Sequence, residues 1–426
     1  MNQRTYPAAL SGAGAQPRRN AALLLAGILL IAANLRTPIT SLSPLIERIR
    51  LDMPISGTFA GMLTALPLLS FAALSPFVPR LAARLGTEAV LFAALLAMLA
   101  GSLAREGGSG FALAAGTIVS GLGIAAGNVM LPALIKREFP LRIGLMTGLY
   151  SIAMNVSAAT ASAVSVPIAD STSLGWRGTF LTIAAVALIA SAFWIPQLKH
   201  NAKAARVSGK PAGRSRSVWR SRLAWRITLV MGLQSFIFYI FVAWLPDMLL
   251  DHGMTGSQAG YMLSLLQVGL IPFAFLVPIV AARLSSQLGL LVLTCCFYFA
   301  GFAGLMMAHG SLALTAASVI VLGIAGGTSF SLAMMFFGLR TRNAREASEI
   351  SGMAQSVGYL LAAVGPFLFG LVHDAVRNWT VPMLLLAVAA AALLLAGIAP
   401  SRGGRFVFPE ETAPEPQPQP TSSVNA

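Results

Sequence analysis

The chain alternates between long apolar runs and short stretches of Gly, Pro or charged residues over most of its length. A helix needs about 20 predominantly apolar residues to cross the hydrocarbon core of a membrane. The first run continues through Pro38 and Pro44 without a convincing cleavage site, so it is predicted as a helix and not as a signal peptide. The runs predict twelve transmembrane helices, at about 20–46, 56–79, 88–104, 110–135, 142–168, 178–198, 225–250, 257–282, 288–308, 312–338, 346–372 and 379–399.

The composition excludes a water-soluble protein. Apolar residues make up 56% of the 426 positions and charged residues only 10%, whereas soluble domains carry roughly 25% charged residues. One membrane domain therefore fills the chain and leaves no room for a soluble catalytic domain. The formal net charge of +15 does not indicate nucleic-acid binding, because the Lys and Arg residues are spread over short loops and do not line one face.

The positive residues instead predict the topology, because Lys and Arg gather in cytoplasmic loops. We expect both termini in the cytoplasm and the protein in a bacterial inner membrane. Three segments fall outside the helices: an N-terminal tail (1–19), a basic, flexible linker (199–224) and a disordered C-terminal tail (401–426). With the N-terminus inside, only five of the 29 Lys and Arg fall in outer loops, namely Arg48, Arg50, Arg105, Arg177 and Arg377.

The sequence also repeats itself at a nearly constant offset. The tetrapeptide that begins at Ala82 recurs from Ala281, and Trp176 is matched by Trp379. Such a repeat predicts an all-α membrane protein in which two six-helix lobes have the same orientation. A parallel repeat of this kind is typical of secondary transporters with a binding site near the bilayer midplane. The predicted lobes are residues 20–198 and 225–400.

Arg36 is the most unusual residue, because it lies deep within the first predicted helix. A charge at that depth costs roughly 2.5 to 3.5 kcal/mol. Thr40 follows one turn later on the same face, and Asn34 extends the polar stripe. Two readings remain open: Arg36 extends to the outer surface or to a neighbouring carbonyl, or it faces a central cavity and binds an anionic or dipolar solute with its forked donors.

Weaker polar faces occur on other predicted helices, where an interhelical hydrogen bond explains each residue as well as solute contact does. The candidates are Asn128, Asn155, Gln234, Tyr239, Gln267, Gln355 and Tyr359. No carboxylate lies near a predicted helix midpoint, so the sequence shows no evident proton-carrying residue in the membrane. Cys295 and Cys296 are adjacent in an apolar run, and we expect both to be buried hydrophobic residues rather than disulfide or metal partners.

Three further motifs are Asn34–Pro38 with Ser43–Leu45, a turn at Pro79–Gly86, and Trp244–Pro246 before Ala259–Gly260. Together with the twelve helices and the repeat, they resemble the major facilitator superfamily and within it the cyanate permease and nitroimidazole transporter branch. The resemblance implies two lobes that rock about a central site, and it gives Asn155 and Gln355 priority because their helices line that cavity. An Asp usual in the superfamily is replaced by Ala83, so a gating ion pair through it is not implied here.

The predicted function is secondary or facilitative transport of a small solute by alternating access. Arg36 favours an anionic or dipolar solute such as cyanate, whereas the many Met and Phe residues would suit export of nitroimidazole-like drugs. A membrane-embedded enzyme or a receptor is a remote alternative, because no catalytic or metal-ligating group assembles at one membrane depth. We therefore predict no catalytic site, metal or cofactor. The expected partners are the solute and the lipid bilayer. The expected functional unit is a monomer.

Overall fold

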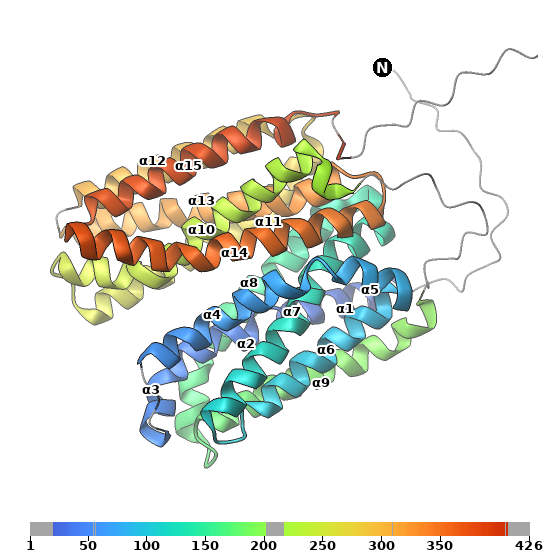
Figure 1. Cartoon of the computed structure of the whole chain (residues 1–426), viewed down its shortest axis with the longest axis horizontal. Coiled ribbons are helices and arrows are strands. Elements are labelled where there is room, and N and C mark those ends of the chain that lie inside the picture. The colour runs from blue at the N-terminus through green and yellow to red at the C-terminus, as the bar shows by residue number, and fades with distance from the viewer. Residues whose placement is uncertain are drawn as a thin grey trace, which may run out of the picture. The chain divides into compact units, whose positions relative to one another are not determined.

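A computed structural model describes residues 20–53, 55, 57–201, 217–308, 310–404 and 406–407. Every regular element among these residues is a helix (Figure 1). The predicted N-terminal tail, most of the basic linker and the residues from 408 onward lie outside the described residues.

The helices match the predicted apolar runs closely. Among the described residues, 11 helices are long and apolar enough to cross a membrane, or up to 12 if the bent pair formed by α4 and α5 is one span. The prediction of an all-helical membrane protein is therefore confirmed. The α-helices are α1 (Ala21–Asn34), α2 (Thr37–Thr40), α3 (Leu42–Asp52), α4 (Gly57–Leu74), α5 (Val78–Leu85), α6 (Thr87–Ala104), α7 (Gly110–Glu138), α8 (Ile143–Ser171), α9 (Trp176–Trp194), α10 (Arg222–Asp251), α11 (Gly256–Arg283), α12 (Leu288–Met307), α13 (Leu312–Leu339), α14 (Ala344–Val376) and α15 (Thr380–Ser401). Short 3-10 helices cover Pro140–Arg142, Ile195–His200 and Val218–Arg220.

The first span is a broken helix. Regular α-helix stops at Asn34, resumes for a single turn in α2, and is interrupted again at Ser41. Arg36 has φ −121° and ψ −27°, outside the helical region. Pro38 and Pro44 lack the N–H that a continuous helix would need at their positions, and proline rings clash with the carbonyl one turn earlier. The two prolines thus account for the two interruptions, one at Arg36 and one at Ser41.

The predicted turn at Pro79–Gly86 is wrong in detail, because most of it is the helix α5. The helix axis bends by 59° between α4 and α5. Pro76 and Pro79 flank the bend, and proline is favoured at the start of a helix, where its missing N–H is not needed. The segment begins a new helix instead of a loop for this reason.

The helices fall into two compact units. Among the described residues, one unit contains 20–131 together with 149–201, and the other contains 132–148 together with 217–407. The division runs through α7 and α8 rather than through the linker alone. The predicted lobe boundaries, 20–198 and 225–400, stay a prediction.

The repeat is visible as a duplicated hydrogen bond. The indole Nε1 of Trp176 donates to Asp52 Oδ2 at 3.0 Å in the first unit, and the indole Nε1 of Trp379 donates to Asp251 Oδ2 at 3.0 Å in the second. Each bond ties the end of a lobe's first span to the start of its last span. The two tryptophans matched in sequence therefore have matched partners.

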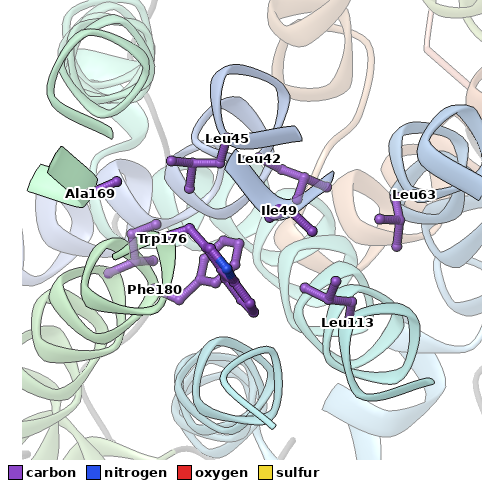
Figure 2. Close-up of a cluster of buried hydrophobic side chains, with 9 residues drawn as sticks. Leu42, Leu45, Ile49, Leu63, Leu113, Ala169, Trp176 and Phe180 are labelled. Atoms are coloured by element: carbon purple, nitrogen blue, oxygen red, sulfur yellow. The ribbon is translucent and has the colours of Figure 1, made fainter. Parts of the chain in front are cut away.

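Apolar side chains strengthen this junction in the first unit. Figure 2 shows Leu42, Leu45 and Ile49 of α3 together with Trp176 and Phe180 of α9, and all five are buried. The cluster also includes four residues of α4, α7, α8 and α9, namely Leu63, Leu113, Ala169 and Ile183. The C-terminal end of the broken first span is therefore packed into the core of its unit.

We expect Trp176→Phe and Trp379→Phe each to lower thermal stability modestly. Each change removes one hydrogen bond to a carboxylate, worth about 1 kcal/mol at a partly exposed site, and keeps an aromatic ring in place. The midpoint of thermal unfolding of the purified protein in detergent measures the effect. Trp219→Phe, at a side chain that is 42% exposed, is the matched control; equal stability of all three variants would contradict the proposed contribution of the duplicated bond.

Candidate functional site

Arg36 stands at the interruption between α1 and α2 and is half-buried. Its carbonyl oxygen accepts hydrogen bonds from the backbone N–H groups of Ile39 and Thr40, both at 3.0 Å. The hydroxyl of Thr40 donates to the same oxygen at 3.2 Å. The single turn of α2 is therefore built on Arg36, and the predicted neighbour Thr40 stabilises that turn.

A buried phenol interacts electrostatically with Arg36. It belongs to Tyr150 of α8, which is 2% exposed. The sequence analysis did not select Tyr150, because the apolar and polar pattern of its helix does not reveal which turn faces Arg36. Both a guanidinium and a phenol can donate hydrogen bonds to a solute.

Three helices of the first unit meet at this interruption. A Cβ on Gly127 of α7 would lie only 2.5 Å from Leu35 Cδ2, so α7 approaches α1 next to Arg36. The Ser157 hydroxyl of α8 donates to the Ala33 carbonyl oxygen of α1 at 3.0 Å. These contacts bring the helices that carry the candidates Asn128 and Asn155 to the Arg36 region.

The asparagine candidates make local contacts. Asn34 is fully buried, and its Nδ2 donates to the Leu30 carbonyl one turn earlier. Asn155 is 5% exposed and donates in the same way to the Ser151 carbonyl. Asn128 is 9% exposed. A contact with a carbonyl of the same helix is typical of an asparagine that stabilises its own helix. The Oδ1 atom of Asn34 has no hydrogen-bond partner among the described residues.

The second unit holds the other five candidates. Gln234 and Tyr239 lie on α10, and Gln355 and Tyr359 lie on α14. These helices approach closely where Gly232 faces Gly358, because a Cβ on either glycine would lie 3.2 Å from the backbone of the other. Gln267 is half-buried on α11, which packs mainly against α13. The structure thus groups four of these five candidates on one helix pair.

Contacts within this second group are also mainly local. Gln234 donates to the Met231 carbonyl oxygen at 3.1 Å and to the Ser235 hydroxyl at 2.6 Å. Gln355 is fully buried and donates to the Ser351 hydroxyl at 3.0 Å, while its Oε1 atom has no hydrogen-bond partner among the described residues. The Tyr239 ring meets Phe238 edge to face, at 5.4 Å between centroids.

Arg105 lies in the loop that follows α6, where the sequence placed it, but its side chain is fully buried, which the sequence did not indicate. The Nη1 atom donates to the Pro38 carbonyl oxygen of α2 at 2.5 Å, and the guanidinium lies over the Phe180 ring, 5.3 Å from its centroid. Burial lowers the pKa of Arg105 to about 10, so the side chain stays protonated at neutral pH.

One further expectation changes, and one residue is buried without a signal in the sequence. Glu88, in the first turn of α6, is fully buried, which its position at a helix end did not indicate. Cys295 is buried as expected, but Cys296 is exposed, because adjacent residues point about 100° apart on a helix. Among the described residues, no group of three or more His, Cys, Asp or Glu could hold a metal ion.

The sequence profile of the Major Facilitator Superfamily matches residues 24–366. The chain belongs to this superfamily. The match confirms the resemblance that the motifs of the first span and of the bend after α4 indicated. It also agrees with the fold, because a solved major facilitator, the proton:xylose symporter XylE bound to 6-bromo-6-deoxy-D-glucose, superposes with a TM-score of 0.71 at 12% identity, covering 91% of this chain and 96% of that chain.

Three major facilitator relatives match nearly end to end. An uncharacterized transporter of Bacillus subtilis, YycB, is 46% identical over 91% of this chain and 95% of its own length. The 2-nitroimidazole transporter of Escherichia coli is 40% identical, over 90% and 96%. The cyanate transport protein CynX of Escherichia coli is 26% identical, over 87% and 95%. The function of this chain is therefore transport of a small solute.

We expect Gly127→Val to impair transport strongly. Its side chain would displace the Leu35 side chain, which is only 1% exposed and precedes Arg36 in the chain. Overpacking costs about 1–3 kcal/mol, which corresponds to a loss of roughly fivefold or more if it falls on solute binding. Uptake into proteoliposomes measures the effect. Gly61→Val is the control, since no atom lies within 4 Å of a Cβ there; normal uptake by Gly127→Val would contradict the importance of this packing.

Proposed function

We propose that this major facilitator carries a small planar solute whose anionic or strongly dipolar group is bound by Arg36. The observation that supports the proposal is the position of Arg36, half-buried at a helix interruption inside the first span. Such a charge costs roughly 2.5 to 3.5 kcal/mol within a membrane. Binding of an acceptor group by the guanidinium fork offsets that cost and gives the residue a function.

A nitro-substituted heterocycle is the first candidate solute. The two coplanar oxygens of a nitro group match the parallel N–H donors of a guanidinium, and the Tyr150 hydroxyl, which interacts electrostatically with Arg36, is a further polar group. The 40% identity to a 2-nitroimidazole transporter favours this class over the small anion that Arg36 alone suggested from sequence.

Cyanate, or a similarly small anion, is the second candidate. A full negative charge gives a stronger charge-assisted contact with Arg36 than a nitro group does. The relative that supports it, a cyanate transport protein, is less similar, at 26% identity.

The proposal has further parts. Asn34, Thr40, Asn128 and Asn155 are proposed as auxiliary contacts in the first unit, and Gln234, Tyr239, Gln267, Gln355 and Tyr359 in the second. Alternating access of two lobes in a bacterial inner membrane, with both termini in the cytoplasm, completes it. We also propose that the monomer transports without a cofactor and catalyses no chemical reaction.

Ligand-dependent thermal stabilisation of the purified protein tests the role of Arg36. The ligands are 2-nitroimidazole and cyanate, and the proteins are wild type, Arg36→Lys and Arg36→Ala. Loss of a charge-assisted hydrogen bond of about 1.5–3 kcal/mol should weaken binding by at least about tenfold in Arg36→Ala. Arg36→Lys keeps the charge but loses the planar fork, so it should bind more weakly than wild type.

Arg50→Ala is the matched control, because Arg50 is an exposed residue on α3. It should bind both ligands as wild type does. If Arg36→Ala binds as tightly as wild type, Arg36 is not a solute ligand. If wild type binds cyanate and not 2-nitroimidazole, the second candidate replaces the first.

A further inference from the structure

Arg105 is a buried cation that the packing of its own unit accommodates. Its side chain is fully buried at the end of α6. A Cβ on Gly116 of α7 would lie 2.8 Å from Arg105 Cγ and 2.9 Å from its backbone N, so the small residue makes room for it. The Phe180 ring, part of the cluster in Figure 2, covers the guanidinium.

Stability does not explain why an arginine occupies this position. The Nε and Nη2 atoms of Arg105 have no hydrogen-bond partner among the described residues. A buried donor without a partner costs about 1–3 kcal/mol, and more when the group is charged. Replacing a buried charge by a well-packed apolar residue is often neutral or stabilising. The hydrogen bond from Arg105 to the Pro38 carbonyl oxygen therefore points to a function other than stability.

That bond holds the short helix α2. Arg105 Nη1 donates to the carbonyl oxygen of Pro38 at 2.5 Å, inside the single turn between the two interruptions of the first span. The turn starts from the Arg36 carbonyl, which accepts from Ile39 and Thr40. A four-residue helix has little stability of its own, so an external contact at its centre fixes the backbone from which the Arg36 side chain extends.

We propose that Arg105 is a positioning residue for solute binding, which fixes α2 and thereby the direction of the Arg36 side chain. This inference rests on the proposed role of Arg36 as solute ligand. Arg105 itself is fully buried and need not touch the solute. Because it acts through a carbonyl contact, any side chain that reaches Pro38 with a charged donor should preserve part of its effect.

Two substitutions distinguish an Arg105 that positions α2 from an Arg105 that only fills space in the core. Arg105→Met keeps a long side chain but removes the donor, and Arg105→Lys keeps a charged donor. We expect Arg105→Met to weaken binding of 2-nitroimidazole or cyanate, whichever stabilises wild type, by about tenfold. Thermal stability without ligand should change little, because removal of two unpaired buried donors offsets the loss of the bond to Pro38. Arg105→Lys should recover most of the affinity. Wild-type affinity in Arg105→Met would overturn the inference, and so would equal loss in both variants.

The double variant with Arg36→Ala distinguishes failure of this inference from failure of the proposed function. If Arg105 acts through Arg36, adding Arg105→Met to Arg36→Ala should weaken binding no further. A full additional loss in the double variant would overturn positioning through Arg36. If Arg36→Ala binds as wild type does, the proposed function fails, whereas weak binding by Arg36→Ala with normal binding by Arg105→Met refutes only the role of Arg105.

A readout without ligand tests the conformation of α2 directly. In a protein with Cys295→Ser and Cys296→Ser, Ile39→Cys places one reactive thiol on α2 and keeps the Thr40 hydroxyl that stabilises this turn. We expect Arg105→Met to raise its alkylation rate by a neutral maleimide several-fold and Arg105→Lys to restore the slower rate. An unchanged rate in Arg105→Met would overturn the inference even if neither solute binds to wild type.

Discussion

The two prolines of the first span impose the constraint on which the site depends. Pro38 and Pro44 prevent a continuous helix, and polar backbone groups exposed by a break within a membrane must find partners inside the protein. The Thr40 hydroxyl donates to the Arg36 carbonyl, and Arg105 donates to the Pro38 carbonyl. The interruption is therefore stabilised by side chains, and it places Arg36 where the chain departs from regular helix.

Packing and hydrogen bonding both connect the segment after the interruption to its unit. Helix α3 packs through Leu42, Leu45 and Ile49 into the apolar cluster of the first unit, and the bond from Trp176 to Asp52 joins α3 to α9. The second unit repeats this bond with Trp379 and Asp251. Under the proposed alternating access, these contacts would preserve the internal geometry of each unit.

The sequence predicted the helices well because the thickness of a membrane sets the length of each apolar run. It also singled out Arg36, since a charge within an apolar run is conspicuous. It failed where a residue's role depends on a distant partner. Arg105 reads as a loop residue before Glu106 and two glycines, and only its contact with the Pro38 carbonyl reveals its place. Tyr150 is similar, because its significance comes from the approach of α8 to Arg36.

Protection of a single thiol by solute tests the central claim, that solute binds at the Arg36 interruption, most directly. The protein carries Ile39→Cys with Cys295→Ser and Cys296→Ser, and a matched protein carries the thiol at the exposed Ser109→Cys position. A transported solute, 2-nitroimidazole or cyanate, should slow alkylation of the thiol at position 39 by a neutral maleimide in a concentration-dependent way and leave the thiol at position 109 unaffected. An unchanged rate at position 39, under conditions where the same protein transports that solute, would contradict the account.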